Sequence, residues 1–136
     1  MELNTFVTEY GDKQTHHFTV TETVYKGFQL SSGDMNPLHT DESFALEKGF
    51  LGRVMYGNIL NGFISFFIGE CLPTKEVIIH TQDIKYKSPV YLNDALLFEA
   101  RLEGFYESVK AVEFKYKFYN NSEKIVASGH IQIGLL

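Results

Sequence analysis

The sequence lacks several features that would assign it to a special class of protein. Its only cysteine is Cys71, so no disulfide can form within the chain, and we expect a reducing, cytoplasmic location. Lysine and arginine form no run, and the formal net charge is -5, which argues against nucleic acid or an anionic membrane surface as a partner. The longest apolar stretch, residues 59–72, is interrupted by polar residues and glycines and is too short to span a bilayer. Small molecules are therefore the expected partners.

Proline is also scarce, and what remains is the composition of an ordinary folded domain. The three prolines are scattered and mark no linker, and no repeat is visible. With 44% hydrophobic and 21% charged residues, the chain is expected to form a single domain over residues 1–136. Tryptophan is absent, but 12 phenylalanines and 8 tyrosines favour a sheet, because aromatic rings suit a half-buried pleated surface.

Helical signals dominate the first half of the chain. A short strand at residues 17–20 is expected to lead into a helix that begins behind Thr21 as its N-cap. After a loop, Thr40 is the expected cap of a second, short helix that ends at Gly49. A third helix, residues 58–72, has almost no polar face, so we expect other parts of the protein to bury it on every side.

Strand signals dominate the second half. Apolar and polar residues alternate along residues 110–120, which is typical of a strand with one solvated face. Residues 125–133 alternate likewise, and residues 76–87 and 95–106 are also predicted strands. Four strands in succession with short connections predict an antiparallel meander. The predicted fold class is therefore α+β, with an antiparallel sheet wrapped around the apolar helix.

One loop carries the residues best suited to chemistry. Residues 32–41 place Asp34 and His39 five positions apart, and Gly33 and Pro37 constrain the backbone around them. An imidazole titrates near neutrality and an ionised carboxylate can hold a water, so the pair could perform acid–base catalysis. The same residues are typical of an Asx turn that leads into a helix cap, and spacing alone leaves both interpretations open.

A longer pattern resembles that of a known family. Residues 28–45, FQLSSGDMNPLHTDESFA, are similar to the signature of the MaoC-like, (R)-specific enoyl-CoA hydratases and 3-hydroxyacyl dehydratases. The segments GFLGRVMYGNILNGFISFFIG and DIKYKSPVYLND resemble the family's central helix with its preceding loop, and a strand with its proline-containing connection. The resemblance covers nearly the whole chain. It implies a hot-dog fold, in which the sheet wraps around the central helix, and a homodimer or higher homo-oligomer.

The resemblance also implies a reaction and the residues that perform it. Asp34 and His39 match the family's catalytic pair, which activates a water for addition to C3 of a trans-2-enoyl thioester, giving the (R)-3-hydroxyacyl product. The backbone N–H of Gly57 matches the oxyanion donor, a role that suits a free amide at a helix N-terminus. Asn36 is implied to help fix the catalytic loop. No metal is implied, and no cofactor beyond the coenzyme A of the substrate.

Substrate-binding positions are implied as well. Ser65 and Ile68 fall where the family lines its acyl pocket, although the Ser65 hydroxyl could equally bond to a carbonyl one turn earlier in its helix. At the oxyanion turn the family usually has His-Gly-Met, whereas this chain has Tyr56 and Asn58 around the glycine. These two residues are expected to affect the acyl-chain preference, and Asn58 could instead only cap the helix.

Other functions remain compatible with the sequence. The same reaction on an acyl-carrier-protein thioester is the nearest, and a hot-dog thioesterase and a non-catalytic acyl-thioester-binding protein are two more. Arg53, Lys85 and Lys87 are candidates for contacts to the phosphates of coenzyme A, although exposed basic residues seldom have a specific role. The remaining histidines have no second ligand at metal-binding spacing, and Cys71 is expected in the core.

Overall fold

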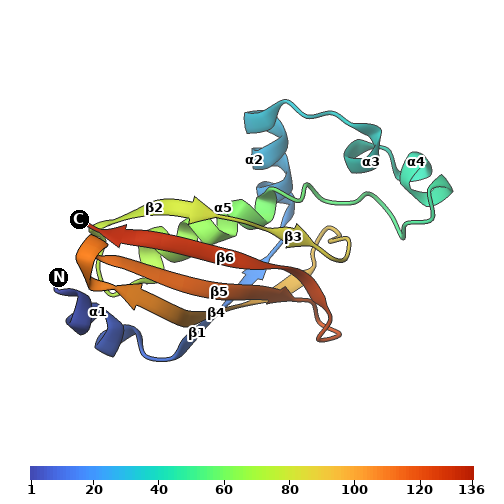
Figure 1. The fold of residues 1–136 in the computed structure, drawn as a ribbon. Coiled ribbons are helices and arrows are strands. Elements are labelled where there is room, and N and C mark those ends of the chain that lie inside the picture. The colour runs from blue at the N-terminus through green and yellow to red at the C-terminus, as the bar shows by residue number, and fades with distance from the viewer.

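The centre of the structure is an antiparallel sheet built mostly from the second half of the chain. The computed structural model describes all of residues 1–136. Its strands are, in chain order, β1 (Lys13–Thr19), β2 (Val77–Gln82), β3 (Lys85–Tyr86), β4 (Ala95–Tyr106), β5 (Ala111–Tyr119) and β6 (Ile125–Leu135). Five of them are ordered β1-β4-β5-β6-β2 across the sheet, and β3 also pairs with β6 (Figure 1). Every pairing is antiparallel.

The predicted four-strand meander is wrong in one respect. β4, β5 and β6 neighbour one another in chain order as predicted, but β2 pairs with β6 and not with β4. Both edges of β4 are occupied, one by β1 and the other by β5, so β6 offers the edge on which β2 and β3 pair. The predicted strand at residues 17–20 is also longer than expected, since β1 begins at Lys13.

Five α-helices and two short helical turns complete the fold. They are α1 (Leu3–Tyr10), α2 (Glu22–Ser32), α3 (Pro37–Thr40), α4 (Glu42–Glu47), α5 (Ile59–Phe66), the π-helical turn η1 (Phe67–Cys71) and the 3₁₀ turn η2 (Glu107–Val109). Thr21 caps α2 as predicted, because its hydroxyl oxygen accepts from the Val24 N–H at 3.2 Å. The predicted cap of α4 is wrong. Asp41 accepts from the Phe44 N–H, and Thr40 is instead the last residue of α3.

The inner face of the sheet packs on α5 (Figure 1). Alternate residues of β5 point inward and are fully buried, as the alternation predicted: Val112, Phe114, Tyr116 and Phe118. From α5, Ile59, Leu60 and Ile64 join the same apolar core. An antiparallel sheet packed around one apolar helix is the hot-dog fold, so the predicted α+β class is confirmed.

The expectation that the apolar helix is buried on every side is wrong. Gly62, Ser65 and Phe66 lie on an exposed face of α5, and 46% of Phe66 is accessible to solvent. The reason is that the sheet covers only one side of the helix. No helix of the protein is long and apolar enough to cross a membrane.

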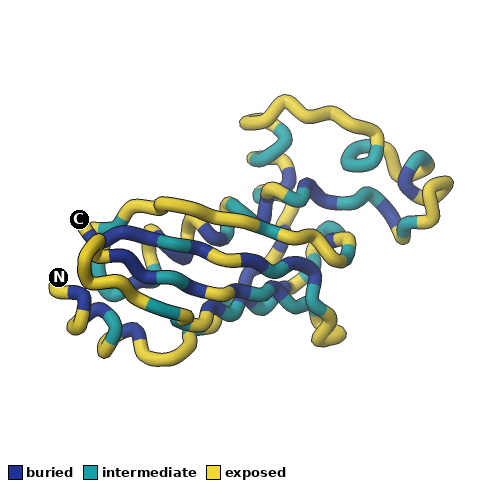
Figure 2. Tube along the Cα trace, viewed as in Figure 1, coloured by how far each residue is buried: buried dark blue, intermediate teal, exposed yellow.

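The segment from α2 to α4 forms an arm that projects beyond one end of the sheet (Figure 1). Figure 2 shows that the outer part of this arm, residues 30–37, is exposed. The chain then returns along residues 50–57 to the start of α5. This returning segment bonds to the arm through the Val54 N–H, 3.0 Å from the Leu38 carbonyl oxygen. The returning segment therefore holds the loop of residues 32–41 near the beginning of α5.

Candidate active site

The loop that carries Asp34 is held by side-chain hydrogen bonds to its own backbone. α2 ends at Gly33, whose φ of 71° is left-handed and favours glycine. The Ser32 hydroxyl accepts from the Asp34 N–H at 3.2 Å, and Asp34 Oδ1 accepts from the Asn36 N–H at 2.9 Å. Asn36 Oδ1 accepts from the Leu38 N–H at 2.9 Å and caps α3. The Asx turn expected as an alternative is therefore present, and it leaves Asp34 Oδ2 free.

His39 is fixed in one tautomer and faces Asp34. Its Nδ1 lies 2.7 Å from the Val54 carbonyl oxygen, which can only accept, so Nδ1 carries the hydrogen of the neutral ring. Nε2 has the free lone pair and lies 3.9 Å from Asp34 Oδ2. That separation is too long for a direct hydrogen bond, and it allows both atoms to contact one water at ordinary hydrogen-bond lengths. The side chains of His39 and Asp34 are 18% and 45% exposed, so water can reach them.

Tyr56 contacts both members of the pair. Its ring centroid lies 4.2 Å from that of His39, and its hydroxyl donates to the Asp34 carbonyl oxygen. Gln29 Nε2 donates to the Tyr56 hydroxyl at 3.3 Å. Tyr56 is 3% exposed, and burial raises the pKa of its phenol above the ordinary value of 10.0, so the hydroxyl remains a donor near neutral pH. Tyr56 therefore binds the backbone of the loop through its hydroxyl and packs against the His39 imidazole with its ring.

A second tyrosine holds the other end of the loop. The Tyr25 hydroxyl donates to the His39 carbonyl oxygen at 2.7 Å. Gln29 lies one turn further along α2, and its Nε2 also donates to the Tyr25 hydroxyl at 3.3 Å. Arg53 Nη1 lies 3.4 Å from the same hydroxyl, and the guanidinium carbon lies 5.1 Å from the ring centroid. Arg53, a candidate for phosphate contacts, is thus in contact with a tyrosine that holds the Asp34–His39 loop.

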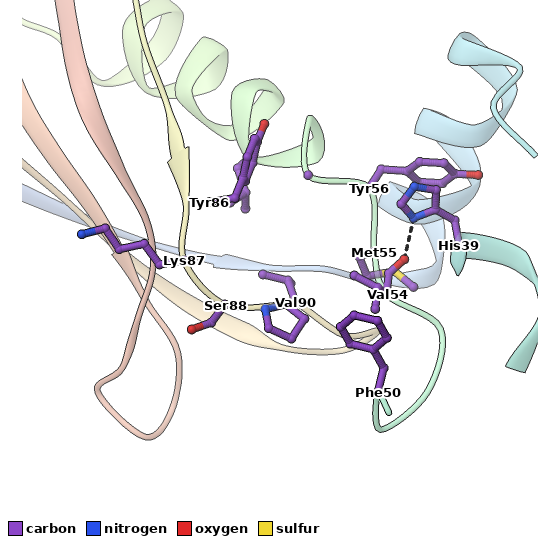
Figure 3. A pocket seen from close by; sticks show the side chains of 12 residues that line it. His39, Phe50, Val54, Met55, Tyr56, Tyr86, Lys87, Ser88 and Val90 are labelled. Carbon is purple, nitrogen blue, oxygen red and sulfur yellow. Dashed lines mark hydrogen bonds between the residues drawn. The ribbon is translucent and has the colours of Figure 1, made fainter. Parts of the chain in front are cut away.

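A cavity of about 360 Å³ opens beside His39, and Tyr56 and Gly57 also line it (Figure 3). Its apolar lining includes Phe50, Met55, Leu60 and Val90. The amide N–H of Gly57 donates to no group of the protein, and it precedes α5 by two residues. A free amide at the start of a helix, in an apolar cavity beside an imidazole, is suited to bind a carbonyl oxygen that gains negative charge.

Gly57 is in close contact with Tyr86 of β3. A Cβ atom at position 57 would lie 2.8 Å from Tyr86 Cε1, so a side chain there would displace the tyrosine ring. The Tyr86 hydroxyl donates to Asn58 Oδ1 at 3.3 Å, and the same oxygen accepts from Asn61 Nδ2 at 2.8 Å. The Asn58 side chain makes no capping hydrogen bond to α5, so the alternative that it only caps the helix is wrong.

The structure brings some of the predicted site residues together and separates others. His39 and Gly57 line one cavity, and Asp34 faces His39 without lining the cavity itself. Ser65 is exposed on α5, whereas Ile68 is buried in the core, and neither lines this cavity. Their assignment to an acyl pocket stays a prediction. No group of three or more His, Cys, Asp or Glu side chains is placed to hold a metal ion.

Four groups of the site were not predicted from the sequence: the Val54 carbonyl and the side chains of Tyr25, Gln29 and Tyr86. One signal was present, because Tyr25 and Gln29 are four residues apart and share a face of α2. A backbone carbonyl has no sequence signal. Tyr86 reaches Gly57 from another element, so its role depends on how the chain folds.

Fold and site together define a class of protein, the hot-dog enzymes that carry an Asp–His pair on a loop beside the central helix. A family model described as a MaoC like domain matches residues 6–123. The chain belongs to this MaoC-like family of hydratases and dehydratases, whose members act on acyl thioesters.

Individual relatives agree with this assignment. An (R)-specific enoyl-CoA hydratase from Rhodospirillum rubrum is 32% identical over 97 residues, which cover 71% of this chain and 67% of that protein. An unliganded R-hydratase from Pseudomonas aeruginosa superposes with a TM-score of 0.83 at 27% identity, covering 92% of this chain and 80% of that one. The (R)-hydratase of Aeromonas caviae gives a TM-score of 0.85 at 24% identity, covering 93% and 96% of the two chains, which shows the shared fold.

Proposed function

We propose that this protein reversibly adds water to a trans-2-enoyl-CoA and forms the (R)-3-hydroxyacyl-CoA. The observation that carries the proposal is the geometry around His39. Its free Nε2 lies 3.9 Å from Asp34 Oδ2, beside a cavity that also contains the unbonded amide of Gly57. The family, and the (R)-specific enoyl-CoA hydratase among its relatives, support the choice of reaction and of product configuration.

Asp34 and His39 activate the water in this proposal. Asp34 Oδ2 and His39 Nε2 hold one water between them, and Nε2 takes one of its protons. The water oxygen bonds to C3 as the C2–C3 double bond breaks, and the electron pair moves onto the thioester oxygen. The imidazolium, stabilised by the Asp34 carboxylate, then delivers the proton to C2 and the thioester carbonyl re-forms. One water has been added, and dehydration is the same sequence in reverse.

The Gly57 amide stabilises the charge that develops on the thioester oxygen. Its N–H is unused by the protein and lies at the positive end of the α5 dipole. Most of the cavity lining is apolar, and a hydrogen bond to an oxyanion is stronger in such surroundings than in bulk water. The contact with Tyr86 explains why position 57 has no side chain.

Hydration of crotonyl-CoA, followed by the loss of enoyl absorbance, tests the proposal. Asp34→Asn and His39→Gln should each lower kcat by about 10²–10⁴, because each removes a group that transfers or holds the proton. His17→Gln is the matched control, since His17 is exposed on β1 and does not line the cavity. It should retain the wild-type rate.

Three outcomes would contradict the proposal. Wild-type rates in both Asp34→Asn and His39→Gln would remove the pair from catalysis. Release of free thiol from acyl-CoA would indicate a thioesterase. Binding of crotonyl-CoA in a calorimeter without any turnover would indicate a non-catalytic acyl-thioester-binding protein.

We also propose that the protein forms a homodimer through the free edge of β2. This strand pairs only with β6, and its other edge has unpaired backbone groups. Ile78 and Ile79 on it are 53% and 39% exposed. An open edge with exposed apolar residues is the surface on which a second copy can continue a sheet.

A further inference from the structure

A second hollow, which we name the basic cleft, lies on the outer face of the sheet. It has a volume of about 330 Å³ and is lined by four lysines, Lys85, Lys87, Lys115 and Lys117, together with His130 and Asp83. The register of the strands explains the cluster. Ser128 of β6 lies between Lys85 of β3 and Lys117 of β5 in one row across the sheet. Two residues further along these strands, and on the same face of the sheet, Lys115 of β5 lies opposite His130 of β6.

The lysines of the basic cleft make no direct ion pair, although Glu99 of β4 lies opposite Lys117 in the strand register. None of the four lysines lies within 4.0 Å of a carboxylate. The only acidic residue in the cleft, Asp83, is already engaged: its carboxylate accepts from the His130 N–H at 3.1 Å and lies 3.4 Å from His130 Nδ1. Four ammonium groups gathered in one hollow repel one another, so the cluster favours the binding of an anion.

The basic cleft adjoins the cavity that contains His39. Lys87 lines both hollows, and Tyr86 next to it covers Gly57. Figure 3 shows the Lys87 side chain directed away from His39, toward the sheet. β3 has one neighbour, β6, so its other edge is open and a slender chain can cross it from the cavity to the cleft.

We propose that the basic cleft binds the phosphate groups of the coenzyme A moiety while the acyl thioester lies beside His39. This inference rests on the proposed function and identifies the carrier of the acyl group. Coenzyme A has a diphosphate and a 3′-phosphate at the end of a flexible pantetheine arm, which suits a concave basic site joined to the reaction cavity. An acidic carrier protein needs a broad basic surface, whereas this chain has a net charge of -5 and places four lysines together in one hollow.

Isothermal titration calorimetry with coenzyme A, and with pantetheine as the phosphate-free probe, tests this inference without turnover. The double variant Lys115→Gln/Lys117→Gln removes two cleft charges and leaves the lining of the His39 cavity intact. We expect its Kd for coenzyme A to rise about tenfold, because two partly exposed charge pairs are lost, while its Kd for pantetheine is unchanged. Higher ionic strength should reduce the difference in Kd for coenzyme A between the wild type and this variant.

Lys48→Gln/Lys110→Gln is the matched control, since it makes the same change of charge at two lysines outside the basic cleft. It should bind coenzyme A like the wild type. In steady-state assays, the Lys115→Gln/Lys117→Gln variant should show an increased KM for crotonyl-CoA and an unchanged KM for crotonyl-pantetheine, with kcat retained on both.

The inference is overturned if the Kd of the Lys115→Gln/Lys117→Gln variant for coenzyme A differs less than twofold from that of the wild type. It is overturned equally if the variant's affinity for pantetheine falls by the same factor as its affinity for coenzyme A. It is also overturned if the double variant loses turnover on an acyl-carrier-protein substrate but not on crotonyl-CoA. Failure of the proposed function is distinguishable. A wild-type protein that hydrates no enoyl-CoA, but whose affinity for coenzyme A depends on Lys115 and Lys117, supports the cleft and contradicts the hydratase.

Discussion

His39 has every polar atom but one bonded to the protein. Its Nδ1 donates to the Val54 carbonyl, its backbone carbonyl accepts from Tyr25, and its backbone N–H donates to the Asn36 carbonyl at 2.9 Å. Only Nε2 has no hydrogen bond. A side chain held in this way has little freedom to lose when substrate binds, and the atom left open is the one that proton transfer requires.

Tyr56→Phe should slow the chemical step more than it weakens substrate binding. The change removes the hydroxyl that donates to the Asp34 carbonyl and keeps the ring against His39. We expect kcat to fall about tenfold as the loop loosens, with KM within about twofold. The free energy of unfolding should fall by about 1 kcal/mol for the lost hydrogen bond. Because burial raises the pKa of Tyr56 above its ordinary value, the loss of kcat should be equal at about pH 6 and about pH 9.

Tyr119→Phe is a suitable control, because Tyr119 is a half-buried tyrosine at the end of β5 and does not line the cavity. It should keep the wild-type kcat. A loss confined to KM in Tyr56→Phe would place Tyr56 in substrate binding, the role expected from sequence. Rates identical to wild type would show that the loop needs no support from this hydroxyl.

The proposed catalytic pair was indicated from sequence because Asp34 and His39 lie on one short loop that resembles the family signature; their spacing alone left an Asx turn equally open. The groups that orient the pair could not be located from sequence. Val54 acts through its backbone, and Tyr86 belongs to a strand that comes near Gly57 only in the folded chain. Sequence thus indicates residues whose role is local, and it is silent on contacts that tertiary structure creates.

At the scale of elements, the local sequence pattern predicted which segments form strands and helices better than it predicted which strands pair with each other. The alternation along β5 and the Thr21 cap of α2 are both present in the structure. The helix α1 was not predicted, although Leu3, Phe6 and Tyr10 lie at helical spacing and are buried. The pairing of β2 with β6 depends on which strand edge is left open, and no local pattern contains that information.

Ile64 tests the packing of α5 on the sheet. The residue is fully buried in the apolar core. Ile64→Ala should lower the free energy of unfolding by about 2–5 kcal/mol, and Ile64→Val by about 0.5–1.5 kcal/mol, because alanine leaves a larger cavity than valine. Urea denaturation followed by far-UV circular dichroism measures both.

Ser65→Ala, at the next position, is the control for that series, because Ser65 lies on the exposed face of the same helix. Its free energy of unfolding should remain within about 0.5 kcal/mol of wild type. If Ile64→Ala were no more destabilising than Ser65→Ala, α5 would not pack on the sheet through this face.

At the scale of the whole molecule, the two outer strands of the sheet differ in a way that favours association at one of them. β1 has the sequence KQTHHFT, with Lys13 and two histidines, and charged or polar residues on an edge strand discourage pairing with another chain. β2 has the sequence VIIHTQ, with no lysine, glutamate or proline to block its edge. The asymmetry predicts that a second copy pairs with β2 and not with β1.

Ile78→Lys/Ile79→Lys should convert the dimer into a monomer. Both side chains are exposed in the single chain, so the folded protomer should tolerate the lysines, whereas a dimer would bring the charges of two copies together across the β2 edge. Sedimentation velocity should give a dimer for the wild type and a monomer for the variant.

Val109→Lys is the control, because Val109 is 61% exposed but lies in η2 between β4 and β5, and this variant should stay dimeric. A wild-type protein that sediments as a monomer, or a double-lysine variant that remains a dimer, would show that the open edge of β2 is not the interface. The surface to examine next would then be the exposed face of α5 around Phe66, which the sheet leaves uncovered.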